Sequence, residues 1–149
     1  METTSLAEPI DILLVEDNPG DVRLVKEAFS TASSLETEFT VFSDGVSAVE
    51  YLSDPTPADD EYPLLLLLDL NLPRMDGFEV LEAIQDEPGL SRLPVLVLTS
   101  STDENDIADC YERAANAYLT KPSGPAEFDE LVEAVEHFWF QTVRLPPTP

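Results

Sequence analysis

Acidic side chains directly follow two strongly apolar stretches of this sequence. Asp69 closes the leucine run Leu64–Leu68, and the pair Glu16-Asp17 follows Ile12–Val15. Neither stretch alternates apolar with polar residues, so each is predicted to be a strand buried on both faces. Open sheets of parallel strands place their ligand sites beyond the carboxyl ends of the strands. The sequence therefore predicts that carboxylates from two strands face one crevice.

Carboxylates that converge in this way need a partner. Two of them about 4 Å apart repel each other by roughly 4 kcal/mol at an effective dielectric of about 20. Either one carboxyl group takes up a proton, or a divalent cation binds among them. All of the nearby ligand atoms are oxygens, which favours Mg²⁺ over Zn²⁺ as the cofactor. A carboxylate beside bound Mg²⁺ can attack phosphorus and form an aspartyl phosphate.

Two further predicted strands end in side chains that suit a phosphoryl group. Thr99-Ser100 follows Val95–Leu98, and Lys121 comes shortly after the brief strand Ala117–Leu119. A hydroxyl and an ammonium group would thus reach the crevice from the other side. Since Lys121 is one of only two lysines in the chain, we expect it to be kept for its positive charge, which a phosphoryl group would need.

The segments between these strand ends alternate between strand and helix. Strands are predicted over Ile10–Val15, Phe39–Ser43, Leu64–Leu68, Val95–Leu98 and Ala117–Leu119. Helices are predicted to begin near Pro19, Asp44, Asp76, Ser101 and Pro125. Five such units predict an α/β fold with a doubly wound, five-stranded parallel sheet in the flavodoxin-like order 2-1-3-4-5. The first and third strands are then neighbours, which brings the acidic groups together.

Capping side chains mark two of these helix starts. Asn18 is predicted to be the N-cap of the first helix, with Pro19 at its first position. A capping box from Ser101 to Glu104 is predicted to open the fourth helix. With Ser101 in that role, the hydroxyl of Thr99 is left for the crevice.

The composition fits one domain with a substantial core, because 43% of the 149 residues are hydrophobic. No apolar stretch of about 18 residues is present, so we expect no membrane insertion. Residues 1–9 lack the pattern of a secretory signal, and the lone cysteine, Cys110, fits a reducing cytoplasm. We expect a flexible segment over residues 1–9, one domain over residues 10–139 and a C-terminal extension over residues 140–149.

The chain is strongly acidic, with 31 Asp and Glu against 7 Lys and Arg and a formal net charge of -24. These acidic residues are spread along the chain, and they would repel nucleic-acid phosphates, which excludes direct binding to nucleic acid. Self-repulsion destabilises the fold at low salt, whereas about 1 M salt shortens the screening length to about 3 Å. We therefore expect a halophilic host with a salt-rich cytoplasm; the alternative is an ordinary acidic cytoplasmic protein.

Four motifs, in this order at consecutive strand ends, together resemble the receiver domains of two-component response regulators, the CheY-like family. They are Leu13-Leu14-Val15-Glu16-Asp17, Asp69-Leu70-Asn71-Leu72-Pro73 with Met75-Asp76-Gly77, Thr99-Ser100, and Lys121-Pro122. The resemblance covers about Ile10 to Phe138. It implies that Asp69 is the phosphoacceptor. It also implies that Asp17 and Asp69 bind Mg²⁺ directly, that Asn71 adds its backbone carbonyl and that Glu16 acts through water.

The same resemblance assigns the remaining roles around the phosphoryl group. Lys121 contacts that group, and the Lys121-Pro122 peptide bond is cis in the family. Thr99 turns its hydroxyl toward the phosphoryl group, and Tyr118 swings inward behind it as the second part of a switch. Ser100 is small enough to leave access for phosphate. The alternative for Tyr118 is an aromatic residue that only packs on an edge strand.

The resemblance implies a stand-alone signalling protein rather than an enzyme. A sensor histidine kinase would phosphorylate Asp69, and the surface of the fourth helix, fifth strand and fifth helix would then bind a downstream protein target. The alternative is an intermediate phosphate carrier or sink in a phosphorelay. A remote alternative is an aspartate-nucleophile phosphatase, which usually has a second acidic residue where this chain has Asn71. A flavin carrier would need a phosphate loop after the first strand, which is lacking.

A narrower resemblance concerns the two ends of the domain. The stretch Glu16–Leu24 and the ending Phe138-Trp139-Phe140 look like single-domain regulators paired with phytochrome-type and other PAS/GAF sensor kinases. In that group the end of the last helix and its extension can help to form a homodimer. Three consecutive aromatic residues cannot all face inward on one helix, so at least one is expected to be exposed and to contact a partner or a second copy. The alternative is that the tail folds back and packs on it.

Overall fold

The computed structural model describes residues 10–32, 36–53, 65–90, 93–113 and 115–137. Its strands are β1 (Ile10–Val15), β2 (Thr37–Phe42), β3 (Leu65–Leu68), β4 (Val95–Thr99) and β5 (Ala117–Thr120). Its helices are α1 (Pro19–Ala32), α2 (Gly45–Ser53), α3 (Gly77–Gln85), α4 (Glu104–Glu112) and α5 (Pro125–Val135), with a short 3₁₀ helix, η2, at Pro88–Leu90. The expected terminal segments, Leu64 and the aromatic run from Phe138 lie outside the described residues.

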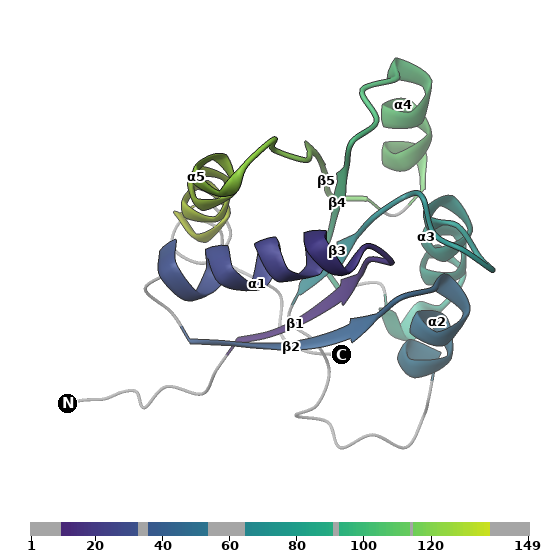
Figure 1. The fold of residues 1–149 in the computed structure, drawn as a ribbon. Helices are drawn as coiled ribbons and strands as arrows, with labels where there is room; N and C mark the ends of the chain where they lie inside the picture. The colour runs from purple at the N-terminus through teal and green to yellow at the C-terminus, as the bar shows by residue number, and fades with distance from the viewer. Residues whose placement is uncertain (1–9, 33–35, 54–64, 91–92, 114, 138–149) are drawn as a thin grey trace.

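The five strands form one parallel sheet in the order β2-β1-β3-β4-β5. This confirms the predicted α/β fold class and strand order. Helices α1 and α5 cover one face of the sheet, and α2 and α3 cover the other (Figure 1). Because all five strands are parallel, their carboxyl ends lie at one edge of the sheet, and the predicted site residues follow these ends.

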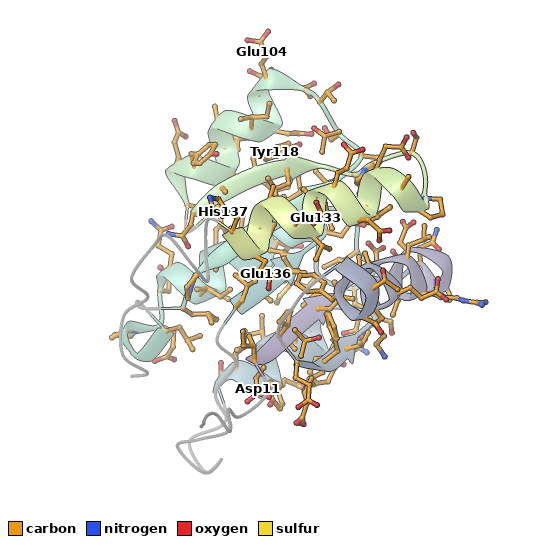
Figure 2. All side chains as sticks on the ribbon, turned by 90° about the vertical axis from the view of Figure 1, so that its left-hand side faces the viewer. Asp11, Glu104, Tyr118, Glu133, Glu136 and His137 are labelled. Carbon is orange, nitrogen blue, oxygen red and sulfur yellow. The ribbon has the colours of Figure 1, made fainter. Side chains whose placement is uncertain are left out.

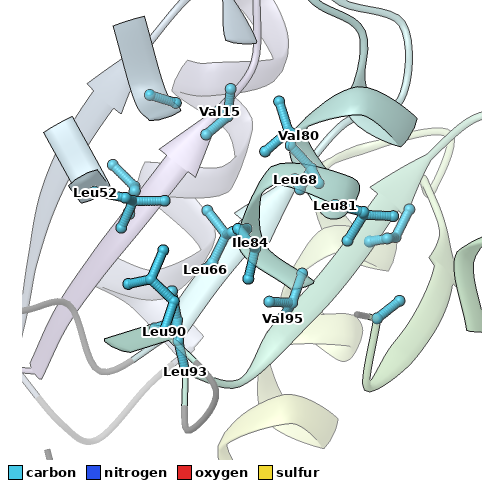
Figure 3. Packing of buried hydrophobic residues seen from close by; sticks show 14 of the residues in the cluster. Val15, Leu52, Leu66, Leu68, Val80, Leu81, Ile84, Leu90, Leu93 and Val95 are labelled. Atoms are coloured by element: carbon cyan, nitrogen blue, oxygen red, sulfur yellow. The ribbon is translucent and has the colours of Figure 1, made fainter. Parts of the chain in front are cut away.

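The core is divided into two layers by the alternation of side chains along the central strands. On the α2 and α3 side, Leu66 and Leu68 of β3 pack with Val80 and Ile84 (Figure 3). Leu65 and Leu67 point to the opposite side, into a second cluster formed with α1 and α5. All four leucines of β3 are at most 3% exposed. Replacing any one of them by alanine should lower the free energy of unfolding by on the order of 2–5 kcal/mol. This packing fixes β3, whose end carries Asp69.

The helix caps follow the predictions in part. Asn18 caps α1, because its Oδ1 accepts hydrogen bonds from the backbone N–H groups of Gly20 and Asp21 at 2.8 and 3.2 Å. The predicted capping box at Ser101 is wrong. Asp103 is the N-cap of α4 and accepts from the N–H of Asn105 at 2.7 Å.

The Ser101 hydroxyl has other partners. It donates to Asp106 Oδ2 at 2.7 Å and accepts from the N–H of Asp103 at 3.3 Å. The helix therefore starts two residues later than the serine suggested, since the aspartate lies closer to the first free N–H groups and caps them directly.

Candidate functional site

The carboxyl ends of β1 and β3 are joined by the backbone. Val15 is in register with Leu68, and the N–H of Asp69 donates to the Val15 carbonyl at 3.0 Å. The N–H of Glu16 in turn donates to the Phe42 carbonyl of β2 at 3.0 Å. These bonds fix the backbone on which the acidic side chains stand, so their positions are set by the sheet rather than by a loose loop.

Three carboxylates meet at this point. Glu16, Asp17 and Asp69 each offer a ligand oxygen, and these oxygens all lie within 4.8 Å of one another. Glu16 and Asp69 are only 3% and 5% exposed, whereas Asp17 is exposed. Asn71 follows on the next loop, and its N–H donates to Asp69 Oδ1 at 3.4 Å. An all-oxygen donor set with one open side fits Mg²⁺ or another hard divalent cation.

Lys121 reaches the same cluster from β5. Its backbone N–H donates to the Thr99 carbonyl at 2.7 Å, which continues the pairing of β5 with β4 beyond the strand. Its Nζ then lies 2.6 Å from Glu16 Oε1, 2.8 Å from Asp21 Oδ2 and 3.1 Å from Asp69 Oδ2. The Lys121-Pro122 peptide bond is trans, so the expected cis bond is wrong for this structure. The trans backbone nevertheless brings the ammonium group into the site.

Asp21 was not predicted to belong to the site. It lies in the first turn of α1, where an acidic residue is ordinarily explained by the helix dipole alone. The sequence offered one indication of this role: Asp21 comes three residues after the N-cap Asn18 and four residues after Asp17. What the sequence could not show is that the carboxylate faces Lys121.

The charges in the site do not balance. Three carboxylates, those of Glu16, Asp21 and Asp69, contact the ammonium group of Lys121, and Asp17 adds a fourth to the acidic cluster. Burial raises the pKa of Glu16 from 4.5 to about 7, and the charge of Asp69 adds to this rise, although hydrogen bonding to Lys121 opposes it. Burial acts to lower the pKa of Lys121, but its bonds to Asp21 and Glu16 and the charge of Asp69 raise that pKa above its ordinary value. The site therefore favours additional positive charge.

The end of β4 supplies the hydroxyl groups. Thr99 is fully buried, whereas the neighbouring Ser100 is exposed. Because β4 lies between β3 and β5, both residues end at the same edge of the sheet as Asp69 and Lys121. Thr99 and Ser100 therefore follow a strand that lies on the other side of β3 from β1.

Tyr118 lies on β5, between α4 and α5 (Figure 2). It is partly buried, and its hydroxyl donates to the Ser101 carbonyl at 2.8 Å. Its backbone N–H donates to the hydroxyl of Tyr111 on α4 at 3.1 Å. Burial raises the pKa of the Tyr118 phenol above its ordinary value, although the bond to Ser101 opposes this. The ring therefore connects β5 to the loop that follows Thr99.

Close backbone packing fixes the loop between β3 and α3. A side chain on Gly77 would place its Cβ 2.5 Å from the Asp69 carbonyl oxygen. In the same loop Arg74 adopts a φ of 66°, and its guanidinium donates to Asp44 at 3.3 Å. The sequence did not predict these contacts, because no sequence pattern indicates that an arginine adopts a positive φ. They join the segment after β3 to the start of α3 and to Asp44, the residue before α2.

Comparisons with known proteins identify the family of this chain. The chain belongs to the response regulator receiver domain family, whose model matches residues 12–136. It is similar to the response regulator Rcp1 from a strain of Synechocystis, with 43% identity over 139 residues that cover 93% of this chain and 94% of Rcp1.

Two solved structures extend the likeness to three dimensions. The Mn(2+)-bound form of response regulator Rcp1 matches with a TM-score of 0.81 at 43% identity, covering 93% of this chain and 100% of that one. The phosphorylated cyanobacterial phytochrome response regulator RcpA matches with a TM-score of 0.85 at 40% identity, covering 94% and 100%. Within the described part of the chain, every helix is too short or too polar to cross a membrane.

Proposed function

We propose that this receiver domain accepts a phosphoryl group on Asp69 from a sensor histidine kinase and signals through protein contacts. The observation that carries the proposal is the contact of Asp69 Oδ2 with Lys121 Nζ, at 3.1 Å, inside a cluster of carboxylates able to hold a divalent cation. A nucleophile, a fixed positive charge and a cation-binding group thus share one buried position. Mg²⁺ is the proposed cofactor, because all the ligand atoms are oxygens.

Each residue has a definite task in the transfer. A carboxylate oxygen of Asp69 attacks phosphorus, the bond from phosphorus to the donor nitrogen breaks, and the released histidine takes up a proton. Asp17, Asp69 and the backbone carbonyl of Asn71 would hold the cation directly, and Glu16 would hold it through water. When bound, the cation neutralises charge that develops on the phosphoryl oxygens.

On the opposite side of the site, Lys121 pairs with one phosphoryl oxygen. The hydroxyl of Thr99 would donate to another, and the exposed position of Ser100 leaves the approach open. In this scheme Asp69 is the nucleophile, and Glu16 and Asp17 serve only to hold the cation.

The signal would leave the site through Tyr118. Its hydroxyl bonds the carbonyl of Ser101, two residues after Thr99. A shift of Thr99 toward a phosphoryl group would therefore move the partner of the tyrosine, and with it the contact to Tyr111 on α4. The population of two packings would change because the phosphate contacts favour one of them. The surface formed by α4, β5 and α5 is the proposed site for a downstream protein.

The resemblance to the phytochrome response regulator RcpA supports a kinase of the phytochrome or PAS/GAF type as the partner. We propose a cytoplasmic location and, from the net charge of -24, a salt-rich host. A homodimer formed by the C-terminal extension is also proposed. Sedimentation of a chain ending at Glu136 should show the loss of self-association, and an unchanged sedimentation coefficient would count against the dimer.

The phosphoacceptor can be tested by mass. Incubation with acetyl phosphate and Mg²⁺ should add the mass of one phosphoryl group, and the Asp69→Asn variant should gain none. Asp76→Asn is the matched control, because Asp76 lies in the same loop but caps α3 instead of facing the cluster. A mass gain that survives in Asp69→Asn would place the acceptor elsewhere.

A further inference from the structure

The ammonium group of Lys121 makes three close contacts, which equals the number of its N–H donors. Two of its partners, Glu16 and Asp69, also belong to the cluster that can hold a cation. The third partner, Asp21, lies outside that cluster. The lysine is therefore shared between two carboxylates that a cation would also need and one that it would not.

Asp21 is well placed to hold the lysine. It stands in the first turn of α1, and its own N–H is bonded to the cap Asn18 at 3.2 Å. Its side chain is 27% exposed, and that of Lys121 is 11% exposed. A charged hydrogen bond of 2.8 Å in this partly buried position is strong and directional.

Lys121 contacts Glu16 through Oε1 and Asp69 through Oδ2, and the same two carboxylates could hold a divalent cation. A bound cation would draw negative charge from both groups and so weaken their contacts with Lys121. Without another anion close by, the long side chain would turn to solvent, and the positive charge beside Asp69 would be lost. Asp21 supplies that anion from a backbone position that the cation does not touch.

We propose that Asp21 is a positioning residue that keeps Lys121 beside Asp69 when Glu16 and Asp69 turn to a divalent cation. Asp21 neither binds the cation nor touches the phosphoryl group. It acts through the ammonium of Lys121, and this role rests on the proposed function of the site.

The scarcity of lysine gives a direct test. Lys121 and Lys26 are the only two lysines, so the lysine side-chain ammonium groups labelled with ¹⁵N give at most two signals. Lys26 is exposed on α1 and serves as the internal reference. Exchange of the ammonium protons with water is measured with and without Mg²⁺, in the full chain and in Asp21→Ala, Asp21→Asn and the control Glu27→Ala. Glu27 lies on the same helix but pairs with Arg23.

The proposal predicts slow exchange at Lys121 in the wild type under both conditions. In Asp21→Ala, Mg²⁺ should speed exchange at Lys121 by about tenfold, because the remaining charged hydrogen bonds are weakened. Asp21→Asn keeps an acceptor oxygen and should show a smaller acceleration, and Glu27→Ala should show none. The rate of phosphorylation by acetyl phosphate should fall most in Asp21→Ala, less in Asp21→Asn and not at all in Glu27→Ala.

Two results would overturn the positioning role. One is slow exchange at Lys121 in Asp21→Ala with Mg²⁺ bound. The other is fast exchange in the wild type once Mg²⁺ is added. Neither readout needs phosphorylation, so failure of wild-type Asp69 to gain a phosphoryl group would refute the proposed function separately.

Discussion

Replacing Lys121 by methionine should destabilise the metal-free protein by removing the one positive charge that the described residues bring to the site. Methionine keeps most of the length of the apolar stem, so the change is mainly one of charge. The variant leaves Glu16, Asp21 and Asp69 facing one another without their common partner. Loss of one member of a buried ion pair costs about 3–5 kcal/mol.

Two features of the site place the expected cost at the lower end of this range. Asp21 is 27% exposed and regains hydration. Glu16, with a pKa of about 7, can take up a proton at modest cost. We therefore expect the free energy of unfolding to fall by about 3 kcal/mol. Mg²⁺ should stabilise the variant more than the wild type, because the cation replaces the missing ammonium charge.

The assay is urea unfolding at pH 8, with EDTA and then with Mg²⁺. Lys26→Met is the control, since Lys26 is exposed on α1, and it should change stability by no more than about 0.5 kcal/mol. A Lys121→Met variant as stable as the wild type in EDTA would show that the lysine does not hold the carboxylates together, and the electrostatic account of the site would fail.

Three further predictions concern the fold. The Gly77→Ala substitution should lower the free energy of unfolding, measured in urea, by at least about 2 kcal/mol, because the new Cβ would lie 2.5 Å from the Asp69 carbonyl oxygen. The control Gly89→Ala should lower it far less, because its nearest contact would be 3.8 Å away. Burial raises the pKa of Cys110 from 9.0 to about 11, so an aromatic disulfide reagent should label it at pH 8 only after unfolding. The stability due to this thiol is complete below pH 9 and is lost as the pH rises toward 11. Melting temperature should rise with KCl, because salt screens a charge of -24; a flat or falling curve would contradict the halophile proposal.

The sheet could be predicted because its strands are buried on both faces. Unbroken apolar runs such as Leu65–Leu68 have few other uses in a chain of this size. Once the strand order is parallel and doubly wound, the positions of Asp69 and Lys121 at one edge follow from the topology. The pairing Val15 to Leu68 shows how closely the strand ends coincide.

Features that depend on local competition or on distant contacts could not be predicted. Ser101 and Asp103 are both capable N-caps, and only packing decides that the aspartate caps α4. Strand β2 begins at Thr37 because β1 extends to meet it at Ile10, although the apolar pattern starts later. Asp21 has the same local signal as any acidic residue in a first helical turn. Its contact with Lys121 depends on the way α1 lies over the end of the sheet.

The most direct test of the site is to identify the phosphorylated residue chemically. Borohydride reduces an aspartyl phosphate to homoserine, which peptide mass spectrometry locates in the sequence. After treatment with acetyl phosphate and Mg²⁺, we expect homoserine at position 69, its loss when Mg²⁺ is chelated, and a strong decrease in Lys121→Met. Homoserine at another aspartate, or the same yield at position 69 without Mg²⁺, would contradict a magnesium-assisted phosphorylation site at the ends of β1, β3, β4 and β5.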